Sequence, residues 1–355
     1  MPNPLSSPTT NPTPIFEFFR GAYATELLTA AVAHFSVFKI LAEQPQTLDE
    51  LASQLNLASR PANVLITALK AMQLLEQDDQ QRLQLTPLAL EHLVPGNPFD
   101  VSGYVGLAAE APGVLEMVRR LRTNQPAGAE APAHPSTPAK GTAFIYREGV
   151  ESAMEQTDSA RGLTLSLAGR ARNVAPKLAE VADLASAHCL LDVGGGSGIY
   201  AIACLLQQPN LRAQVWDRPE VLRVAAEFAQ QYGVADRLEC LPGDMFSDEI
   251  PRGADRILLS NVLHDWDIPE CRQLIDRCAA ALPSSGQLWI HDVFLNDDLS
   301  GPLPIALYSA GLFTLTEGRA YSAGEYRQWL LDANLQPLPV LPTLVHCGLL
   351  PAIKP

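Results

Sequence analysis

The sequence lacks most of the features that would place it on nucleic acid or in an oxidising compartment. Its six cysteines include no Cys-x-x-Cys pair, so neither a zinc site nor a disulfide framework is indicated, and a reducing compartment fits best. Basic residues are few, 25 against 39 acidic ones, and the formal net charge is −14. Such a chain would be repelled by a phosphate backbone, which argues against bulk nucleic-acid binding.

Long hydrophobic runs are also absent. The apolar stretches are shorter than the ~18–20 residues that span a bilayer, and Pro342 interrupts the apolar residues 339–350. The first fourteen residues contain no Lys or Arg and no apolar core, which argues against a signal peptide and predicts a disordered tail. We therefore expect a soluble, cytoplasmic protein that does not bind a membrane.

The apolar content is nevertheless sufficient for a large core. Hydrophobic residues make up 47% of the chain and charged residues 18%, which excludes disorder throughout. The 355 residues are about twice the length of a typical domain, so the length predicts two domains.

The N-terminal part has the pattern of a helical module. Residues 15–44 carry apolar residues at helical spacing and predict two helices with wide apolar faces. Thr47 and Glu50 have the spacing of a capping box, and residues 59–61 open a further helix with a proline at its start. A polar turn at residues 76–80 between short apolar segments predicts a small hairpin. Helix, helix and hairpin in this order are typical of a winged helix.

A winged helix can bind DNA or mediate contact between proteins. Within residues 46–87 the bases are Arg60, Lys70 and Arg82, against five acidic residues. A DNA-binding module concentrates positive charge here, so we expect no nucleic-acid binding. The wide apolar faces of residues 15–44 predict instead a homodimer.

From Cys189 onward, short apolar runs alternate with helical patterns. Strands are expected at residues 189–193, 213–217, 238–242, 254–263 and 287–295, with helices at 200–207, 219–232 and 269–282 between them. This alternation predicts βαβ units and a mostly parallel, doubly wound sheet. The final apolar runs, 335–342 and 344–352, are so close together that they must form an antiparallel pair. The outline is that of a class I methyltransferase domain rather than a dehydrogenase.

The strongest local signal is the run LLDVGGGSG at residues 190–198. A strand delivers Asp192, and Gly194, Gly196 and Gly198 then make a tight turn before a helix. Glycines let the backbone approach a ligand closely, and the helix N-terminus offers free N–H groups. Such a turn can bind NAD, FAD or S-adenosylmethionine. The spacing G-x-G-x-G, in place of G-x-G-x-x-G, favours a cofactor built from a nucleoside and an amino acid.

Acidic residues after the next two strands fit a bound nucleoside. Asp217 ends the second expected strand, 19 residues beyond Gly198, where a carboxylate can accept both ribose hydroxyl protons. A helix cap is the alternative role for this residue. Asp244 and Met245 close the third strand, where the carboxylate could accept from the adenine amino group and the thioether could pack on the ring.

The motifs DVGGGSG, VWDRPEV, GDMF and VLHDWDIPEC follow one another behind the winged-helix pattern. With them, the chain resembles the S-adenosylmethionine-dependent small-molecule O-methyltransferases of the caffeate, isoflavone and acetylserotonin type, over roughly residues 15–350. The resemblance implies S-adenosylmethionine as cofactor, a homodimer formed through the N-terminal domain, and His264 as the general base that deprotonates the acceptor hydroxyl. Imidazole suits this role because its unperturbed pKa lies near 6.5.

The resemblance also assigns neighbours to His264. Asp292 aligns with a family carboxylate that orients the catalytic histidine. His264, His291 and Asp292 could instead form a metal site, but residues adjacent on a strand point to opposite faces, so we expect no metal. The family's second orienting glutamate aligns with Ala320. Ser260, which stands where plant members have a lysine, is counted among the expected cofactor-binding residues.

The expected reaction is methyl transfer to a hydroxyl of a small molecule. Because Ala320 cannot act as a carboxylate, S-methylation of a thioether and C-methylation of a keto acid stay open, and Glu317 is a candidate substitute. The alternative outside the enzymes is a DNA-binding regulator that senses S-adenosylmethionine. The acceptor pocket is expected to draw on Phe144, Tyr146, Met154, Trp266 and Tyr308.

The expected fold class is α/β. A Rossmann-like class I methyltransferase domain, with a mostly parallel sheet and an antiparallel edge hairpin, follows an α-helical winged-helix dimerisation domain. The boundaries are a tail at 1–14, the dimerisation domain at 15–105, connecting helices at 106–165 and the S-adenosylmethionine-binding catalytic domain at 166–355. Within the connecting part, residues 124–141 are rich in Pro, Ala and Gly and predict a mobile, exposed loop.

Overall fold

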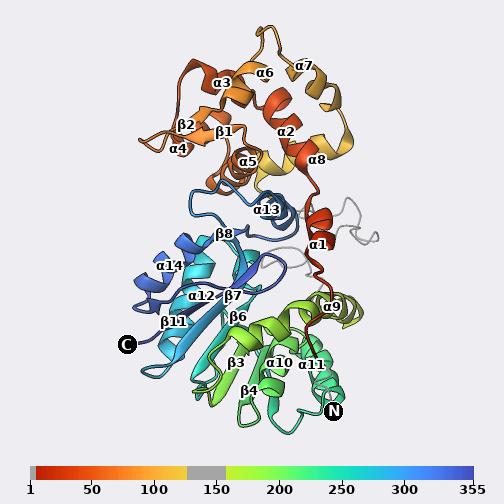
Figure 1. Ribbon diagram of the computed structural model, residues 1–355, viewed down its shortest axis with the longest axis vertical. Coiled ribbons are helices and arrows are strands. Elements are labelled where there is room, and N and C mark those ends of the chain that lie inside the picture. Colours follow the sequence, from red (N-terminus) through yellow and green to blue (C-terminus); the bar gives the residue numbers. More distant parts are fainter. Residues whose placement is uncertain (1–4, 126–156) are drawn as a thin grey trace. The chain divides into compact units, whose positions relative to one another are not determined.

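The computed structural model describes residues 5–125 and 157–355, which form two compact units (Figure 1). The sheet unit comprises residues 5–16, 157–294 and 323–355, and the helical unit comprises residues 17–125 and 295–322. The chain thus leaves the sheet unit after Phe294 and returns to it at Ala323. This division differs from the contiguous domains expected from the sequence, because a segment late in the chain completes the helical unit.

The helical unit is built mainly from short helices. Its elements, with α1 (Thr13–Arg20) at the junction, are α2 (Ala24–Thr29), η1 (Ala30–His34), α3 (Val37–Glu43), α4 (Leu48–Leu55), α5 (Ser59–Ala71), β1 (Leu75–Gln77), β2 (Leu83–Leu85), α6 (Pro87–His92), α7 (Ser102–Val105), η2 (Gly106–Ala108), α8 (Pro112–Thr123), α13 (Leu303–Leu315) and β8 (Tyr321–Ser322). The capping box is confirmed, since the Thr47 hydroxyl accepts from the Glu50 N–H and the Glu50 carboxylate accepts from the Thr47 N–H. Strands β1 and β2 pair antiparallel, as the hairpin pattern predicted.

The prediction of two helices over residues 15–44 was wrong. The segment forms α1, α2 with the π-helical turn η1, and α3. Tyr23 and Ser36 interrupt it, because both adopt the left-handed conformation with φ of 73° and 52°. Gly21 lies in the first break, between α1 and α2, and is a possible helix breaker that the sequence offers; the break at Ser36 has no such sign.

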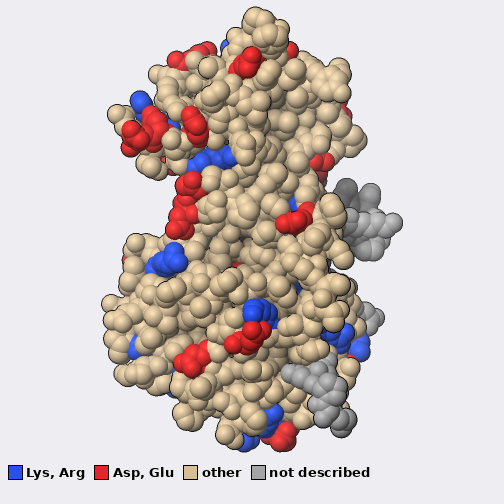
Figure 2. Space-filling model, in the orientation of Figure 1, with Lys and Arg blue, Asp and Glu red and all other residues tan. Residues whose placement is uncertain are grey.

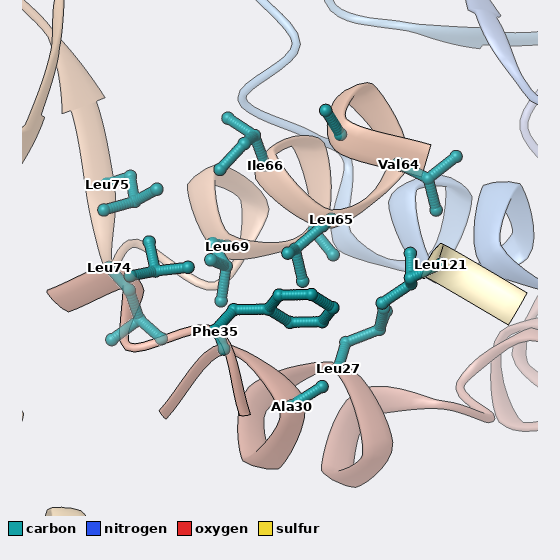
Figure 3. Packing of buried hydrophobic residues seen from close by; sticks show 14 of the residues in the cluster. Leu27, Ala30, Phe35, Val64, Leu65, Ile66, Leu69, Leu74, Leu75 and Leu121 are labelled. Carbon is teal, nitrogen blue, oxygen red and sulfur yellow. The ribbon is translucent and has the colours of Figure 1, made fainter. Parts of the chain in front are cut away.

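The core of the helical unit surrounds α5 (Figure 3). Val64, Leu65 and Leu69 of this helix are fully buried, and each such side chain contributes about 1.5–3 kcal/mol through the area removed from water. Helix α13 adds Leu307, Ala310 and Phe313 to the same cluster, which explains why residues 295–322 belong to this unit.

Arg60 fixes the segment that follows α13. Its buried guanidinium donates to the carbonyl oxygens of Thr316 and Gly318 at 3.1 and 3.3 Å, and to the side chain and carbonyl of Asn124. Arg60, the second residue of α5, thus binds backbone that lies far away in the sequence.

Among the described residues, no single helix is long and apolar enough to span a membrane. In that part of the chain, only the segments Thr13–His34 and Val37–Glu43 together have the required length and composition, and they are bent by 55° relative to each other. Leu27 and Phe38 of that pair lie in the core of the helical unit.

The sheet unit has the predicted alternation of strands and helices. Its elements are α9 (Thr157–Val181), β3 (Cys189–Val193), α10 (Ile199–Gln207), β4 (Arg212–Asp217), α11 (Pro219–Gln231), β5 (Leu238–Pro242), β6 (Arg256–Ser260), η3 (Leu263–Asp265), α12 (Ile268–Ala281), β7 (Gln287–Leu295), α14 (Ala323–Asp332), β9 (Gln336–Pro337), β10 (Leu341–Pro342) and β11 (Cys347–Ile353). Helices α9, α10 and α11 cover one side of the sheet and α12 and α14 the other (Figure 1).

The strand order is β10-β11-β7-β6-β3-β4-β5. Strands β3 to β7 pair parallel, and β11 pairs antiparallel with β7 and with β10, so the predicted parallel sheet with an antiparallel edge is confirmed. The parallel strands bring their carboxyl ends to one edge, where such folds bind ligands. Because Ser260 pairs with His291, Asp292 lies level with the segment that leaves β6.

Candidate functional site

The turn between β3 and α10 is open to a ligand. Gly194, Gly196 and Gly198 have φ of 63°, 60° and 70°, a region that side-chain-bearing residues rarely adopt. A Cβ at Gly196 would meet no atom within 4 Å, so its backbone faces open space. A Cβ at Gly195 would instead lie 2.7 Å from Cγ of Asp192, so this position also requires glycine.

Asp192 lies directly under this turn. Its side chain is 1% exposed, and neither carboxyl oxygen has a hydrogen-bond partner among the residues the structure describes. Burial, reinforced by the charge of Asp217, raises the pKa of Asp192 to about 8, against a smaller lowering by the Ala201 N–H. A buried carboxyl group without partners beside a glycine turn fits a donor or cationic group supplied by a ligand.

Asp217 lies at the end of β4, as predicted, next to the same turn. One carboxylate oxygen accepts from the Gly196 N–H at 2.8 Å and the other from the Arg218 N–H at 2.7 Å. Burial raises the pKa of Asp217, and the two backbone donors act against that rise. A pocket opens beside this strand end, lined by Arg218, Pro219, Glu220, Pro242, Gly243, Asp244 and Asp248.

Asp244 and Met245 follow β5 beside this pocket and turn. Asp244 Oδ1 accepts from the N–H groups of Phe246 and Ser247, so this oxygen stabilises the turn that begins at Asp244. The Met245 sulfur lies 3.9 Å from the point where a Cβ of Gly194 would be. The structure therefore brings the predicted residues of the three strand ends together.

His264 and Asp292 form a buried pair on the other half of this edge. His264 lies in η3, directly after β6, and its Nδ1 is 2.5 Å from Asp292 Oδ1. The same oxygen accepts from the Val293 N–H at 2.8 Å, and Asp292 Oδ2 accepts from the Tyr326 hydroxyl at 3.3 Å. His264 Nε2 is 3.7 Å from Asp265 Oδ1.

The electrostatics of this pair make the His264 imidazole a stronger base than a free imidazole and keep the Asp292 carboxyl group a stronger acid. Burial lowers the pKa of His264, but the charges of Asp292 and Asp265 raise it by more, so the net shift is upward. Burial raises the pKa of Asp292, but His264 lowers it by more, so the net shift is downward. Burial raises the pKa of Asp265 to about 6.

His291 points away from this pair. Its Nδ1 lies 2.9 Å from Ser260 Oγ and its Nε2 lies 3.1 Å from Thr343 Oγ1. Burial, reinforced by Arg170, lowers the pKa of His291 to about 3. His291 and Asp292 therefore do not converge, as the alternation of a strand predicted. In the described part of the chain, no three His, Cys, Asp or Glu side chains are arranged to hold a metal ion.

The other predicted site residues are placed less centrally. Trp266 is buried, and its ring contacts that of Phe246 edge-on, with 4.7 Å between the ring centres. The Ser260 hydroxyl is engaged by His291 and by the Asn261 amide. Tyr308 belongs to the helical unit, where the Arg20 guanidinium lies 4.6 Å from its ring centre. The predicted residues Phe144, Tyr146 and Met154 lie outside the described residues.

Sequence reasoning missed Tyr326 and Arg170. Tyr326 contacts Asp292 only because α14 packs across β7, and no sequence motif predicts this contact. Arg170, on α9, donates to Cys347 Sγ at 3.5 Å and lowers the pKa of His264 and His291 by its charge. An isolated arginine in a long helix gives no signal of this kind in the sequence.

Comparison with known proteins agrees with this geometry. The model of the O-methyltransferase domain family matches residues 139–336. The chain is 36% identical over 325 residues to the 3-hydroxy-5-methyl-1-naphthoate 3-O-methyltransferase of Streptomyces sahachiroi, covering 91% of this chain and 89% of that protein. It is 32% identical over 332 residues to the acetylserotonin O-methyltransferase of Bos taurus, covering 90% and 91%. An O-methyltransferase family 2 protein from Planctomyces limnophilus, solved in complex with apigenin, has a TM-score of 0.87 at 49% identity, covering 99% of this chain and 98% of that one.

The fold and the site thus define a class I methyltransferase. The chain belongs to the O-methyltransferase family. It is an S-adenosylmethionine-dependent enzyme that methylates oxygen on small molecules, and the resemblance drawn from the sequence motifs is confirmed. Of the reactions left open by the sequence, O-methylation is the one that the family model and the relatives above name, although the chain is also 28% identical over 346 residues to the L-tyrosine C(3)-methyltransferase of Streptomyces lavendulae.

Proposed function

We propose that this enzyme methylates an aromatic hydroxyl and that His264 is its general base. The observation that carries the proposal is the buried His264–Asp292 pair at 2.5 Å. The lowered pKa of Asp292 keeps its carboxylate ionised, so it accepts the Nδ1 proton and leaves Nε2 as the nitrogen that can take a proton.

The pair suits the removal of a proton from a phenol. When bound, S-adenosylmethionine supplies a methyl group that its positively charged sulfur already activates. His264 therefore has one task, to take the hydroxyl proton on Nε2 as the oxygen becomes a nucleophile. Asp292 and Asp265 stabilise the imidazolium that forms, because both carboxylates lie within 4 Å of the ring nitrogens.

The glycine turn and the two strand ends beside it fit S-adenosylmethionine. The carboxyl group of Asp192 lacks a partner among the described residues and matches the ammonium of the amino-acid part. Asp217, held at the Gly196 N–H, matches the ribose hydroxyls, and the pocket beside it matches the adenine. Asp244 and Met245 belong to the same proposed cofactor-binding site. Ser260 contributes less than the sequence predicted, because His291 engages its hydroxyl.

Two relatives support an aromatic acceptor. The protein from Planctomyces limnophilus was solved with apigenin, and the relative from Streptomyces sahachiroi is named for a hydroxynaphthoate. Both molecules carry a hydroxyl on an aromatic ring. A phenolic proton, with a pKa near 10, is within reach of a histidine base at cellular pH.

The helical unit is proposed to be a winged-helix module that pairs two copies of the chain. Phe99, Tyr104 and Leu107 of this unit are 63%, 78% and 80% exposed, an apolar surface that a second subunit would cover. On the face shown in Figure 2, its Lys and Arg side chains form no continuous patch, which disfavours DNA binding. All six cysteines are free, which supports a reducing, cytoplasmic location.

The proposal is tested by His264→Gln with apigenin and N-acetylserotonin as acceptors and labelled S-adenosylmethionine as donor. We expect kcat to fall at least about 100-fold, since general-base catalysis contributes on that order, while cofactor binding is retained. His188→Gln, which changes a histidine with a 90% exposed side chain, is the matched control. Turnover within a few-fold of the unaltered enzyme would refute the base role of His264.

A further inference from the structure

The Asp292 carboxylate needs more than His264 to hold its position. The sequence resemblance assigns a second orienting glutamate to position 320, where this chain has alanine. Ala320 is fully buried in the helical unit, and its N–H donates to Ser309 Oγ at 3.1 Å. No acidic side chain is therefore available at that position to act on the histidine.

Tyr326 lies where a group that acts on Asp292 is required. Its side chain is fully buried, and its hydroxyl donates to Asp292 Oδ2 at 3.3 Å. The ring is fixed by edge-on contacts with Phe294 at 5.8 Å and with Trp329 at 5.3 Å. Such tilted aromatic contacts restrict the ring and therefore fix the position of the hydroxyl oxygen.

We propose that Tyr326 is a positioning residue, which holds Asp292 so that Oδ1 faces the Nδ1 of His264. Among the described residues, the hydrogen-bond donors to Asp292 are His264 and Val293 on Oδ1 and Tyr326 on Oδ2. Without the tyrosine hydroxyl, Oδ2 would be buried and unsatisfied, and the carboxylate could rotate about its Cβ–Cγ bond. The inference rests on the proposed role of His264.

A tyrosine has a different electrostatic effect from a glutamate at this place. A second carboxylate would stabilise the imidazolium further and would raise the pH needed for a neutral base. The neutral hydroxyl fixes Asp292 without adding charge. The charged groups that act on His264 are Asp292 from β7, Asp265 from η3 and Arg170 from α9, and none of them changes when the hydroxyl is removed.

The primary test is Tyr326→Phe, which keeps the ring and removes the donor. We expect kcat to fall about tenfold, the effect of losing one long hydrogen bond to a charged group, with KM for S-adenosylmethionine unchanged. The acidic limb of the kcat–pH profile should move upward by about half a pH unit, because the Asp292 charge is no longer shared with a donor. Tyr232→Phe, at the residue directly after α11 whose ring contacts Phe228, is the matched control and should change neither quantity.

The same substitution in a His264→Gln background separates the two hypotheses. If Tyr326 acts through His264, it has no further effect on kcat there, because residues that work as a unit are not additive. An equal loss in both backgrounds, or a profile in the single variant that matches the unaltered enzyme, would overturn the positioning role while the base role stands. If His264→Gln alone keeps full turnover, both proposals are wrong.

Discussion

Asp192→Asn should make the cofactor-free protein more stable at alkaline pH. In the folded state the carboxyl group keeps its proton up to a pKa of about 8, whereas its ordinary value is 3.8. Between these pH values the folded state binds more protons than the unfolded state, so the free energy of unfolding falls as pH rises. Each pH unit accounts for about 1.4 kcal/mol, which gives at most about 6 kcal/mol at pH 8. Asparagine carries no charge and removes this dependence.

Thermal unfolding followed by circular dichroism at pH 5 and pH 8 measures this effect. If half of that free energy is realised, the melting temperature of Asp192→Asn at pH 8 should exceed that of the unaltered protein by roughly 5–10 °C, and the difference should be smaller at pH 5. The exposed Asp236→Asn serves as the control. A variant that melts lower at pH 8, or a difference that does not grow with pH, would refute the reasoning.

Bound cofactor should reverse the higher melting temperature expected for Asp192→Asn. Saturating S-adenosylmethionine should raise the melting temperature of the unaltered protein more than that of Asp192→Asn, because the variant cannot pair a carboxylate with the ligand's ammonium. An equal rise in the melting temperature of both proteins would show that Asp192 does not contact the cofactor.

Two further predictions concern the glycine turn and the helical unit. Gly195→Ala should abolish cofactor binding, since its Cβ would lie 2.7 Å from Asp192 Cγ. Gly196→Ala meets no protein atom, so it should cost the cofactor-free protein only about 1–2 kcal/mol of backbone strain, but its Cβ would enter the space proposed for the cofactor and should weaken binding. Thermal unfolding and calorimetric titration compare the two variants. Light scattering should give twice the chain mass, and the pair Tyr104→Ser and Leu107→Ser should reduce it toward that of a monomer. Leu331→Ser, which changes an exposed leucine of the sheet unit, should leave the mass unchanged, and a monomeric unaltered protein would contradict the proposed pairing.

The sheet could be predicted closely because its signals are local. Strands at 189–193 and 238–242 begin and end as expected, since apolar runs bounded by turn residues determine them. The strand expected at 254–263 ends early, at Ser260, because Asn261 adopts the left-handed conformation with φ of 56°. The apolar Val262 and Leu263 that follow belong to the loop that carries His264, a break that hydrophobic pattern cannot reveal.

The candidate site divides in the same way. His264, Asp217 and the glycine turn were predicted because each follows a strand directly and strand ends meet at one edge. Tyr326 was not, because its contact depends on how α14 lies across β7, which is decided by packing rather than by neighbours in sequence. For the same reason the sequence could not show that residues 303–315 complete the core around α5.

That late helix has a consequence for how the chain is made. A ribosome releases residues 17–125 long before α13, so the core of the helical unit lacks Leu307, Ala310 and Phe313 until most of the sheet has been synthesised. Domains usually fold in order as they emerge, but this unit can close only after the strands up to β7 have left the exit tunnel. A fragment that stops at residue 125 would carry an apolar groove in place of α13. No single cut in the chain would therefore release the whole helical unit from the sheet unit.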